Sequence, residues 1–297
     1  MQINPNSEVN SSKKAWHAHL RLGFSDDVGI TRLTERTHCG PLRVQKPLYP
    51  EGGQVCHAII VHPPGGVVGG DQLHIAVQAH DSSRVVITTP GAAKWYKANG
   101  ETSQQNIQID VGAKASVEWL PQETIFFDTA HVKLVQSVSL AMDASYLACD
   151  ILCFGRSASG ERFHTGKISQ NIKIRRAGQL IWHEQGSFTG GSQAMNTVLG
   201  LADHTVCASL IAVSKAGPAA FSAAQLTALR DEAQALLELA GVADVSQFGV
   251  TQIKTVIVVR FLGDASEIAR QVMLLAWRHL RPVVIGRDAI ELRIWNT

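Results

Sequence analysis

Alternation of apolar and polar side chains is the dominant pattern along the chain. From Trp16 to Arg21 every second residue is apolar, a period of two that predicts a strand with one buried face. Short runs of β-branched and apolar residues recur at intervals of about ten residues, separated by turn signals such as Asn99-Gly100. The further strands expected from these runs are 29–37, 55–61, 73–79, 84–89, 102–111, 116–120, 131–140, 145–154, 163–175, 179–184 and 206–213.

Two stretches near the C-terminus have the composition of helices. Residues 222–239 are rich in Ala, Leu, Gln and Glu, with Ser222 as the expected N-cap. Residues 264–280 form the second expected helix, with Asp264 as N-cap and Arg281-Pro282 as its end. Residues 253–262 between them predict one more strand.

These elements together predict a mainly β fold. We expect a large multi-stranded β scaffold with two α-helices in the C-terminal third. Residues 1–14, rich in Asn, Ser and Lys, are expected to be a disordered N-terminal tail, and residues 15–297 a single domain, because no linker or clear repeat divides them.

A loop rich in proline and glycine interrupts the strands at residues 62–71. Its residues are His62-Pro63-Pro64-Gly65-Gly66-Val67-Val68-Gly69-Gly70-Asp71, and a second turn follows at Pro90-Gly91. Exposed backbone N–H groups in such a loop can bind phosphate, but a P-loop has Gly-Lys-Ser or Gly-Lys-Thr opening a helix. Here Asp71 follows the last glycine, and its charge would repel phosphate. We therefore interpret the segment as a shaped structural loop.

Composition and charge narrow the class of protein. The 297 residues are 45% apolar, and 27 basic against 25 acidic residues give a net charge of +2, so neither nucleic acid nor an anionic membrane is an expected partner. No stretch is long and apolar enough to span a membrane, and residues 1–14 are polar, from which we expect a cytoplasmic protein. Five cysteines without a Cys-x-x-Cys pair indicate reduced thiols.

Three acidic residues stand out from their surroundings. Asp150 interrupts a run that is apolar on both strand faces, so its carboxylate must be paired, hydrogen-bonded or open to a polar cavity. Glu184 closes a strand and could simply be exposed, and Asp71 could be an ordinary turn residue bonded to its own backbone. Taken one at a time, each has a structural explanation.

No catalytic constellation accompanies these acids. His17 and His19 share a strand face about 7 Å apart, a spacing that suits nickel, copper or zinc, but no third ligand is evident from the sequence. The chain has neither the Gly-x-Ser-x-Gly elbow of hydrolases nor a His-Glu-x-x-His motif.

Several motifs in order along the chain resemble the UreD family of urease accessory proteins, also called UreH. The resemblance extends from about Trp16 to the last residue, so it is more specific than any single loop. The motifs are the segments 39–50, 62–66 with Gly70-Asp71, Thr88-Thr89-Pro90-Gly91-Ala92-Ala93-Lys94-Trp95-Tyr96 and 118–125, then Gly155-Arg156, Gly160-Glu161 and Arg293-Ile294-Trp295.

The resemblance implies a non-enzymatic chaperone that helps to build the dinickel site of urease. Members of the family bind UreF, which recruits the GTPase UreG, and the assembly docks on apo-urease. Nickel would be in transit through an internal polar passage, with no cofactor bound permanently. Asp71, Asp150 and Glu184 match acidic residues proposed to line that passage, whereas Ala93 stands where relatives often carry a hydroxyl.

Two other functions remain open at this point. One is a metal-dependent β-barrel enzyme that uses the glycine loop and nearby histidines. The other is a β interaction module with no metal role.

Overall fold

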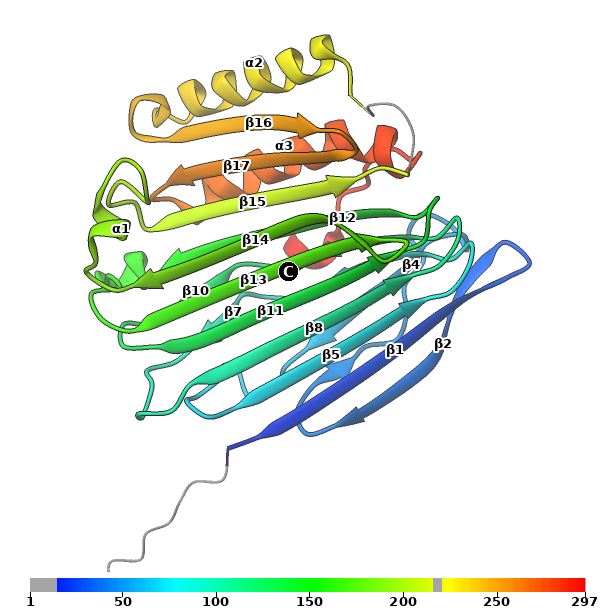
Figure 1. Ribbon diagram of the computed structural model, residues 1–297, viewed down its shortest axis with the longest axis horizontal. Helices are drawn as coiled ribbons and strands as arrows, with labels where there is room; N and C mark the ends of the chain where they lie inside the picture. The colour runs from blue at the N-terminus through cyan, green and yellow to red at the C-terminus, as the bar shows by residue number, and fades with distance from the viewer. Residues whose placement is uncertain (1–14, 216–220, 297) are drawn as a thin grey trace, which may run out of the picture.

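The computed structural model describes residues 15–215 and 221–296, and two facing β-sheets account for most of them (Figure 1). The expected disordered tail, residues 1–14, lies outside these described residues. The mainly β fold with two long helices in the C-terminal third is confirmed. Within the described residues no helix is long and apolar enough to cross a membrane.

The first sheet has seven strands among the described residues. In spatial order they are β14 (Gln179–Thr189), β13 (Lys167–Arg176), β11 (His131–Leu140), β8 (Ser103–Val111), β5 (Gln72–Ala79), β1 (His17–Asp27) and β2 (Ile30–Cys39). Five of them run parallel, and β2 and β14 are antiparallel edge strands.

The second sheet has ten strands in the same described part of the chain. Its main path is β16 (Gln247–Ile253), β17 (Val256–Gly263), β15 (Val206–Val213), β12 (Ser145–Phe154), β9 (Ser116–Leu120), β6 (Arg84–Thr88), β4 (Cys56–Val61) and β3 (Arg43–Val44). The short strands β10 (Thr124–Phe126) and β7 (Ala93–Trp95) extend from β12.

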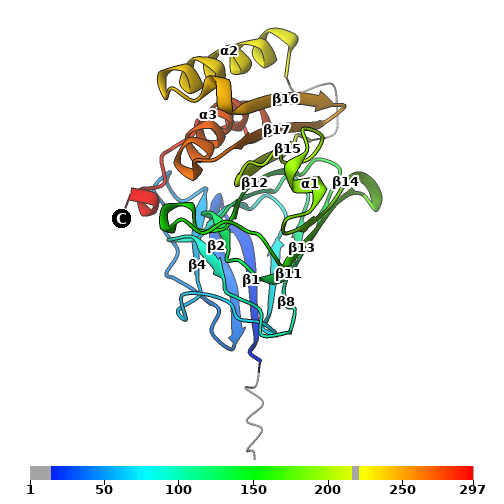
Figure 2. The same cartoon turned by 90° about the vertical axis from the view of Figure 1, so that its left-hand side faces the viewer.

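The chain alternates between the two sheets as it advances. From β4 to β13 it visits the second sheet, then the first, and each return adds a parallel strand next to the previous one. This is a solenoid-like coil whose two flattened sides are the facing layers visible in Figure 2. The space between the layers is therefore lined by residues from successive turns of the coil.

Two hydrophobic cores lie on opposite faces of the second sheet. One fills the space between the sheets, and the other lies between the second sheet and the helices α2 (Ala223–Leu239) and α3 (Ser266–Val284). Strand β12 contributes to both, with Leu152 in the first core and Leu147 and Ile151 in the second. The apolar character of both strand faces, noted in the sequence, follows from this position.

Helix α2 begins as the sequence predicts. Ser222 Oγ accepts a hydrogen bond from Gln225 N at 3.2 Å, and Gln225 Oε1 accepts one from Ser222 N at 2.9 Å, which completes a capping box. Helix α3 differs from the prediction, because Asp264 is not its N-cap. Its carboxylate accepts hydrogen bonds from Thr205 N at 2.9 Å and pairs with His204, so it secures the start of β15 instead.

Three further predictions about the C-terminal third need correction. Helix α3 does not end at Arg281-Pro282 but continues to Val284, because a proline in the last turn removes one N–H without preventing the Ile285 N to Arg281 O bond. The strand expected at residues 253–262 is present as β17 (Val256–Gly263), but it begins later, because residues 253–255 form the end of β16 and the hairpin turn, with Lys254 at a positive φ of 54°. A four-residue helix, α1 (Gln193–Asn196), follows β14, and neither it nor the short strands β3, β7, β10 and β16 was expected.

The capping box gives a direct test of the helix start. We expect Ser222→Ala to lower the free energy of unfolding by about 1 kcal/mol, because the N–H of Gln225 loses its acceptor. Thr227→Ala, in the exposed middle of the same helix, should be neutral or slightly stabilising, because alanine has the higher helix propensity. Urea denaturation followed by circular dichroism measures both. Equal effects of the two substitutions would contradict the assignment of Ser222 as the cap.

Candidate functional site

The proline- and glycine-rich loop lies between β4 and β5 and packs against the segment around Trp95. Val67 N donates to Lys94 O and Tyr96 N donates to Val67 O, both at 2.8 Å. A Cβ at Gly66 would lie 2.3 Å from the ring of Tyr96, so a larger residue does not fit there. The loop residues His62, Gly65 and Gly66 and the Pro90-Gly91 turn line one cavity. Close approach of the Tyr96 ring to the loop therefore accounts for Gly66 without any phosphate.

Asp71 is held by backbone N–H groups at the end of this loop. Its carboxylate accepts hydrogen bonds from Trp16 N at 2.8 Å and from Val68 N at 3.0 Å, and the residue is 4% exposed. Asp71 is not among the residues that line the two cavities described below. Its carboxylate thus fixes the loop, as an ordinary turn residue does, and ties it to the start of β1.

The first cavity lies between the two sheets and has a volume of about 250 Å³. Its wall is mainly apolar but includes the loop residue His62, Gln170 from β13 and Asp150 from β12. The Nε2 atom of His62 is buried and has no hydrogen-bond partner among the described residues. Burial lowers the pKa of His62 although the charge of Asp71 acts in the opposite direction, so this nitrogen is available as a neutral donor or ligand.

A second cavity of about 390 Å³ adjoins the first. The two share Asp150, Leu152, Gln170 and Ile172 as a common wall. The second cavity is also lined by Glu184 of β14 and by Cys207. Burial raises the pKa of the Cys207 thiol to about 12, so it is protonated at neutral pH and is a poor metal ligand in that form.

Asp150 lies where the two cavities meet. Gln170 Nε2 donates to Asp150 Oδ2 at 3.4 Å, a long hydrogen bond, and no other side chain within the described residues donates to this carboxylate. Burial and, secondarily, the negative charge of Glu184 raise the pKa of Asp150 from 3.8 to about 6. The carboxylates of Asp150 and Glu184 therefore influence each other across the second cavity, which both of them line.

Glu184 is paired across the sheets with Arg260 of β17. Arg260 Nη1 donates to Glu184 Oε1 at 3.0 Å, and Nη2 lies 2.9 Å from Oε2. In the described part of the chain, Glu184 Oε2 is the one buried carboxylate oxygen that accepts no hydrogen bond. The structure therefore brings together Asp150 and Glu184 of the three predicted acids, and places Asp71 apart from both cavities.

The histidine pair of β1 lies on the outer face of the first sheet, away from the cavities. His17 and His19 are exposed, and His19 stacks on His74 of β5 with ring centroids 4.7 Å apart. Across residues 15–215 and 221–296, no three side chains of His, Cys, Asp or Glu are grouped so that they could hold a metal ion.

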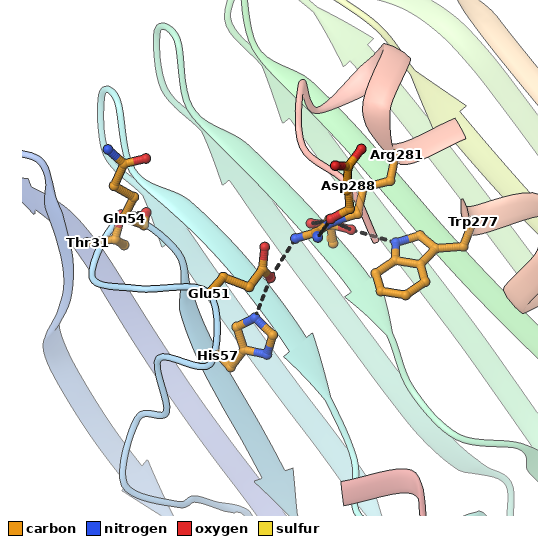
Figure 3. Close-up of polar contacts among 8 residues, drawn as sticks. Thr31, Glu51, Gln54, His57, Trp277, Arg281 and Asp288 are labelled. Atoms are coloured by element: carbon orange, nitrogen blue, oxygen red, sulfur yellow. Dashed lines mark hydrogen bonds and ion pairs between the residues drawn. The ribbon is translucent and has the colours of Figure 1, made fainter. Parts of the chain in front are cut away.

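A second polar cluster, fully enclosed, joins α3 to the second sheet (Figure 3). The Arg281 guanidinium, 0% exposed, donates through Nε to Glu118 at 3.0 Å and through Nη2 to Glu51 Oε1 at 2.7 Å. Trp277 Nε1 donates to Glu118 Oε2 and His57 Nε2 to Glu51 Oε1, both at 2.7 Å. Each charged side chain of this cluster has its partner inside it, so we interpret it as structural.

The electrostatics of this cluster favour the ion pairs. Burial alone would raise the pKa of Glu51, but hydrogen bonds from His57 and Arg281 and their charges lower it to about 2. Burial raises the pKa of Glu118, against the opposing effect of Arg281. The pKa of Arg281 is raised by its two acids despite burial, so the guanidinium remains charged.

Asp150 and Glu184 stand out in the sequence, whereas their partners do not. Gln170 and Arg260 reach Asp150 and Glu184 from strands that are distant in the chain, and nothing in the local pattern marks them. Ala93 does line the first cavity and brings no hydroxyl to it.

The similarity to known proteins extends over nearly the whole chain. A family model described as UreD urease accessory protein matches residues 17–296. The urease accessory protein UreD of Janthinobacterium sp. (strain Marseille) is 54% identical over 280 residues, covering 94% of this chain and 91% of the relative. The protein of the same name from Nitrosospira multiformis is 49% identical over 287 residues, covering 97% of this chain and all of the relative.

The raised pKa of Asp150 predicts a stability that depends on pH. Above pH 6 the folded protein holds a carboxylate that is harder to ionise than in the unfolded chain, whereas below about pH 4 it is protonated in both states. We therefore expect Asp150→Asn to stabilise the fold by up to roughly 3 kcal/mol at pH 8, and the gain to disappear as the pH falls from 6 to 4.

Thermal unfolding between pH 4 and pH 8 measures this gain. Asp231→Asn, an exposed substitution on α2, serves as the control and should not reproduce the pH-dependent gain. A destabilised Asp150→Asn protein at pH 8 would contradict the assignment.

The enclosed cluster predicts a large cost for removing its cation. Arg281→Met should lower the free energy of unfolding by about 3–5 kcal/mol, because Glu118 and Glu51 lose their shared partner in a dry environment. Arg278→Met on the exposed side of the same helix should change it by less than about 0.5 kcal/mol. Urea denaturation measures both, and equal values for the two variants would show that the cluster does not hold α3.

Proposed function

The chain belongs to the UreD family of urease accessory proteins, and on that premise we propose that it guides nickel to apo-urease. In this proposal it is a metallochaperone scaffold and not an enzyme, and nickel passes through without becoming a resident cofactor. It acts in the cytoplasm in a complex with UreF, and UreG joins the complex through UreF. The observation that carries the proposal is the pair of adjoining cavities that have Asp150 in their common wall and Glu184 in the second cavity.

The chemistry of the two cavities supports transit over storage. Ni²⁺ accepts imidazole nitrogen and carboxylate or carbonyl oxygen as ligands, and each can replace part of its hydration shell. His62 offers a neutral nitrogen in the first cavity, Asp150 and Gln170 offer oxygens where the cavities meet, and Glu184 offers oxygens in the second. These groups are spread along the hollow and do not form one cluster, so a cation would keep some water and exchange readily between them.

Asp71 has a different part in this proposal. Its carboxylate holds Trp16 N and Val68 N and so fixes the loop that supplies His62 to the wall of the first cavity. We propose that Asp71 contributes to the passage by keeping this wall in place, and that Asp150 and Glu184 contact the cation.

Activation of urease in cells tests the passage. We expect Asp150→Asn combined with Glu184→Gln to lower the activation of urease severalfold at limiting nickel, because both carboxylates in the hollow lose their charge. Assembly with UreF and UreG, followed by co-purification, should be unchanged, since both side chains line the cavities and neither is a largely exposed surface residue. Nickel content and activity of the purified urease are the measurements.

The matched control removes two exposed charges from helix α2, through Asp231→Asn with Glu238→Gln. Asp71→Asn is a third arm, and it should lower the stability of the protein together with activation, unlike the double substitution in the cavities. Full activation by the Asp150→Asn, Glu184→Gln protein would overturn the passage. Normal urease activity in a strain that lacks this chain would overturn the proposed function as a whole.

A further inference from the structure

A row of residues at one register position leads from the cavities to the edge of the second sheet. Asp150 on β12 is paired with Ser209 on β15, Ser209 with Arg260 on β17, and Arg260 with Gly249 on β16. Residues paired in this way face the same side of a sheet, about 4.8 Å from one strand to the next. All four line the second cavity, so the row runs from the junction of the two cavities outward along its wall.

Arg260 is placed at the outer part of this row with its charged end directed inward. Its Nη1 donates to Glu184 Oε1 and to Ser209 Oγ, both at 3.0 Å, and its Nη2 lies 2.9 Å from Glu184 Oε2. The Arg260 side chain is 49% exposed, whereas that of Glu184 is 21% exposed. The guanidinium is therefore a cation that already occupies the Glu184 carboxylate from the solvent side.

Gly249 leaves the outer end of the row without a side chain. A Cβ built there meets no atom within 4 Å, so the space beside Arg260 is open at this point. The strand carries Gly249 at the edge of the sheet, where no further strand covers it among the described residues. The second cavity therefore has a port, which is bounded by the half-exposed Arg260 on one side and by Gly249 on the other.

We propose that Arg260 is the gate of this port and that a divalent transition-metal cation enters or leaves by replacing its guanidinium at Glu184. The inference rests on the proposed function, since it concerns the same cavities. An arginine does not release its proton, so it cannot itself become a ligand. It must move aside, which its half-exposed position allows, and its charge holds the carboxylate in place while no metal is present.

The gate predicts that removal of Arg260 strengthens metal binding. In Arg260→Gln the Glu184 carboxylate has no resident cation and the entering dication meets no positive charge, so its affinity for Ni²⁺ should rise about tenfold. Adding Glu184→Gln to Arg260→Gln should return the affinity to the level of the unsubstituted protein or below it. Isothermal titration of the full-length chain with Ni²⁺ at pH 7.5 measures these affinities.

Two further variants make the test specific. Arg278→Gln removes one exposed positive charge from α3, which covers the opposite face of the second sheet from the port, and should leave the affinity unchanged. Gly249→Trp places a side chain over the opening and should slow the transfer of bound Ni²⁺ to an added chelator without altering the affinity. Circular dichroism confirms that each variant is folded.

Equal Ni²⁺ affinity of the Arg260→Gln and Arg278→Gln proteins, including the case where neither binds measurably, would overturn the gate. That outcome is separate from failure of the proposed function, which is decided by urease activation in the Asp150→Asn, Glu184→Gln protein. If the Ni²⁺ affinities were equal while the Asp150→Asn, Glu184→Gln protein lowered urease activation, the gate would be overturned and the passage would stand with a different entrance.

Discussion

The buried ion pair between Arg281 and Glu118 is the interaction on which the arrangement of the second sheet and its helices depends. Both side chains are almost completely excluded from water, and Glu51 shares the same guanidinium. Removing two charges from water costs several kcal/mol per ion, and the cost is offset only when the geometry satisfies every donor and acceptor. Here Trp277, His57 and the carbonyl of Asp288 complete the set, so the pair specifies one position of α3 against the sheet.

The position of α3 affects the two cavities, because strand β12 contributes side chains to both hydrophobic cores. Its outward side chains, among them Leu147 and Ile151, pack under the helices, while Leu152 and Asp150 face the space between the sheets. A rigid second core fixes the strand from behind, so Asp150 can be placed beside open space without the strand collapsing into it. The one acid in an otherwise apolar run is thus supported by the packing of its neighbours and needs no arginine of its own.

Much of the architecture could be predicted from local pattern, because strands, turns and the Ser222 cap are determined by residues close in sequence. The coil of alternating sheets could not, since strand order depends on contacts between segments that resemble one another in composition. Asp264 shows the limit at a single residue: an acid before a helix is a good N-cap, yet Thr205 and His204, about sixty residues away, take its oxygens.

The candidate site, too, could be predicted from the sequence only in part. Asp150 could be found from its apolar neighbours, because a carboxylate in such a strand requires a polar environment. Its setting could not be found, since Gln170 comes from the other sheet, and the Glu184 partner Arg260 lies 76 residues further along the chain. Asp71 stands out for its place after a glycine, and its carboxylate accepts hydrogen bonds from the backbone of its own loop and of Trp16, the residue before β1.

The enclosed cluster also has a consequence for the order in which the protein is made. Glu51 and Glu118 are synthesised 230 and 163 residues before Arg281, respectively. The coil of parallel strands can pair turn by turn as it leaves the ribosome, because each new strand bonds to one already present. Glu51 can already pair with His57, six residues further on, but the Arg281 guanidinium that Glu51 and Glu118 share is absent until α3 is made. A chain truncated before residue 281 would therefore carry the whole coil but lack the cation that Glu51 and Glu118 share.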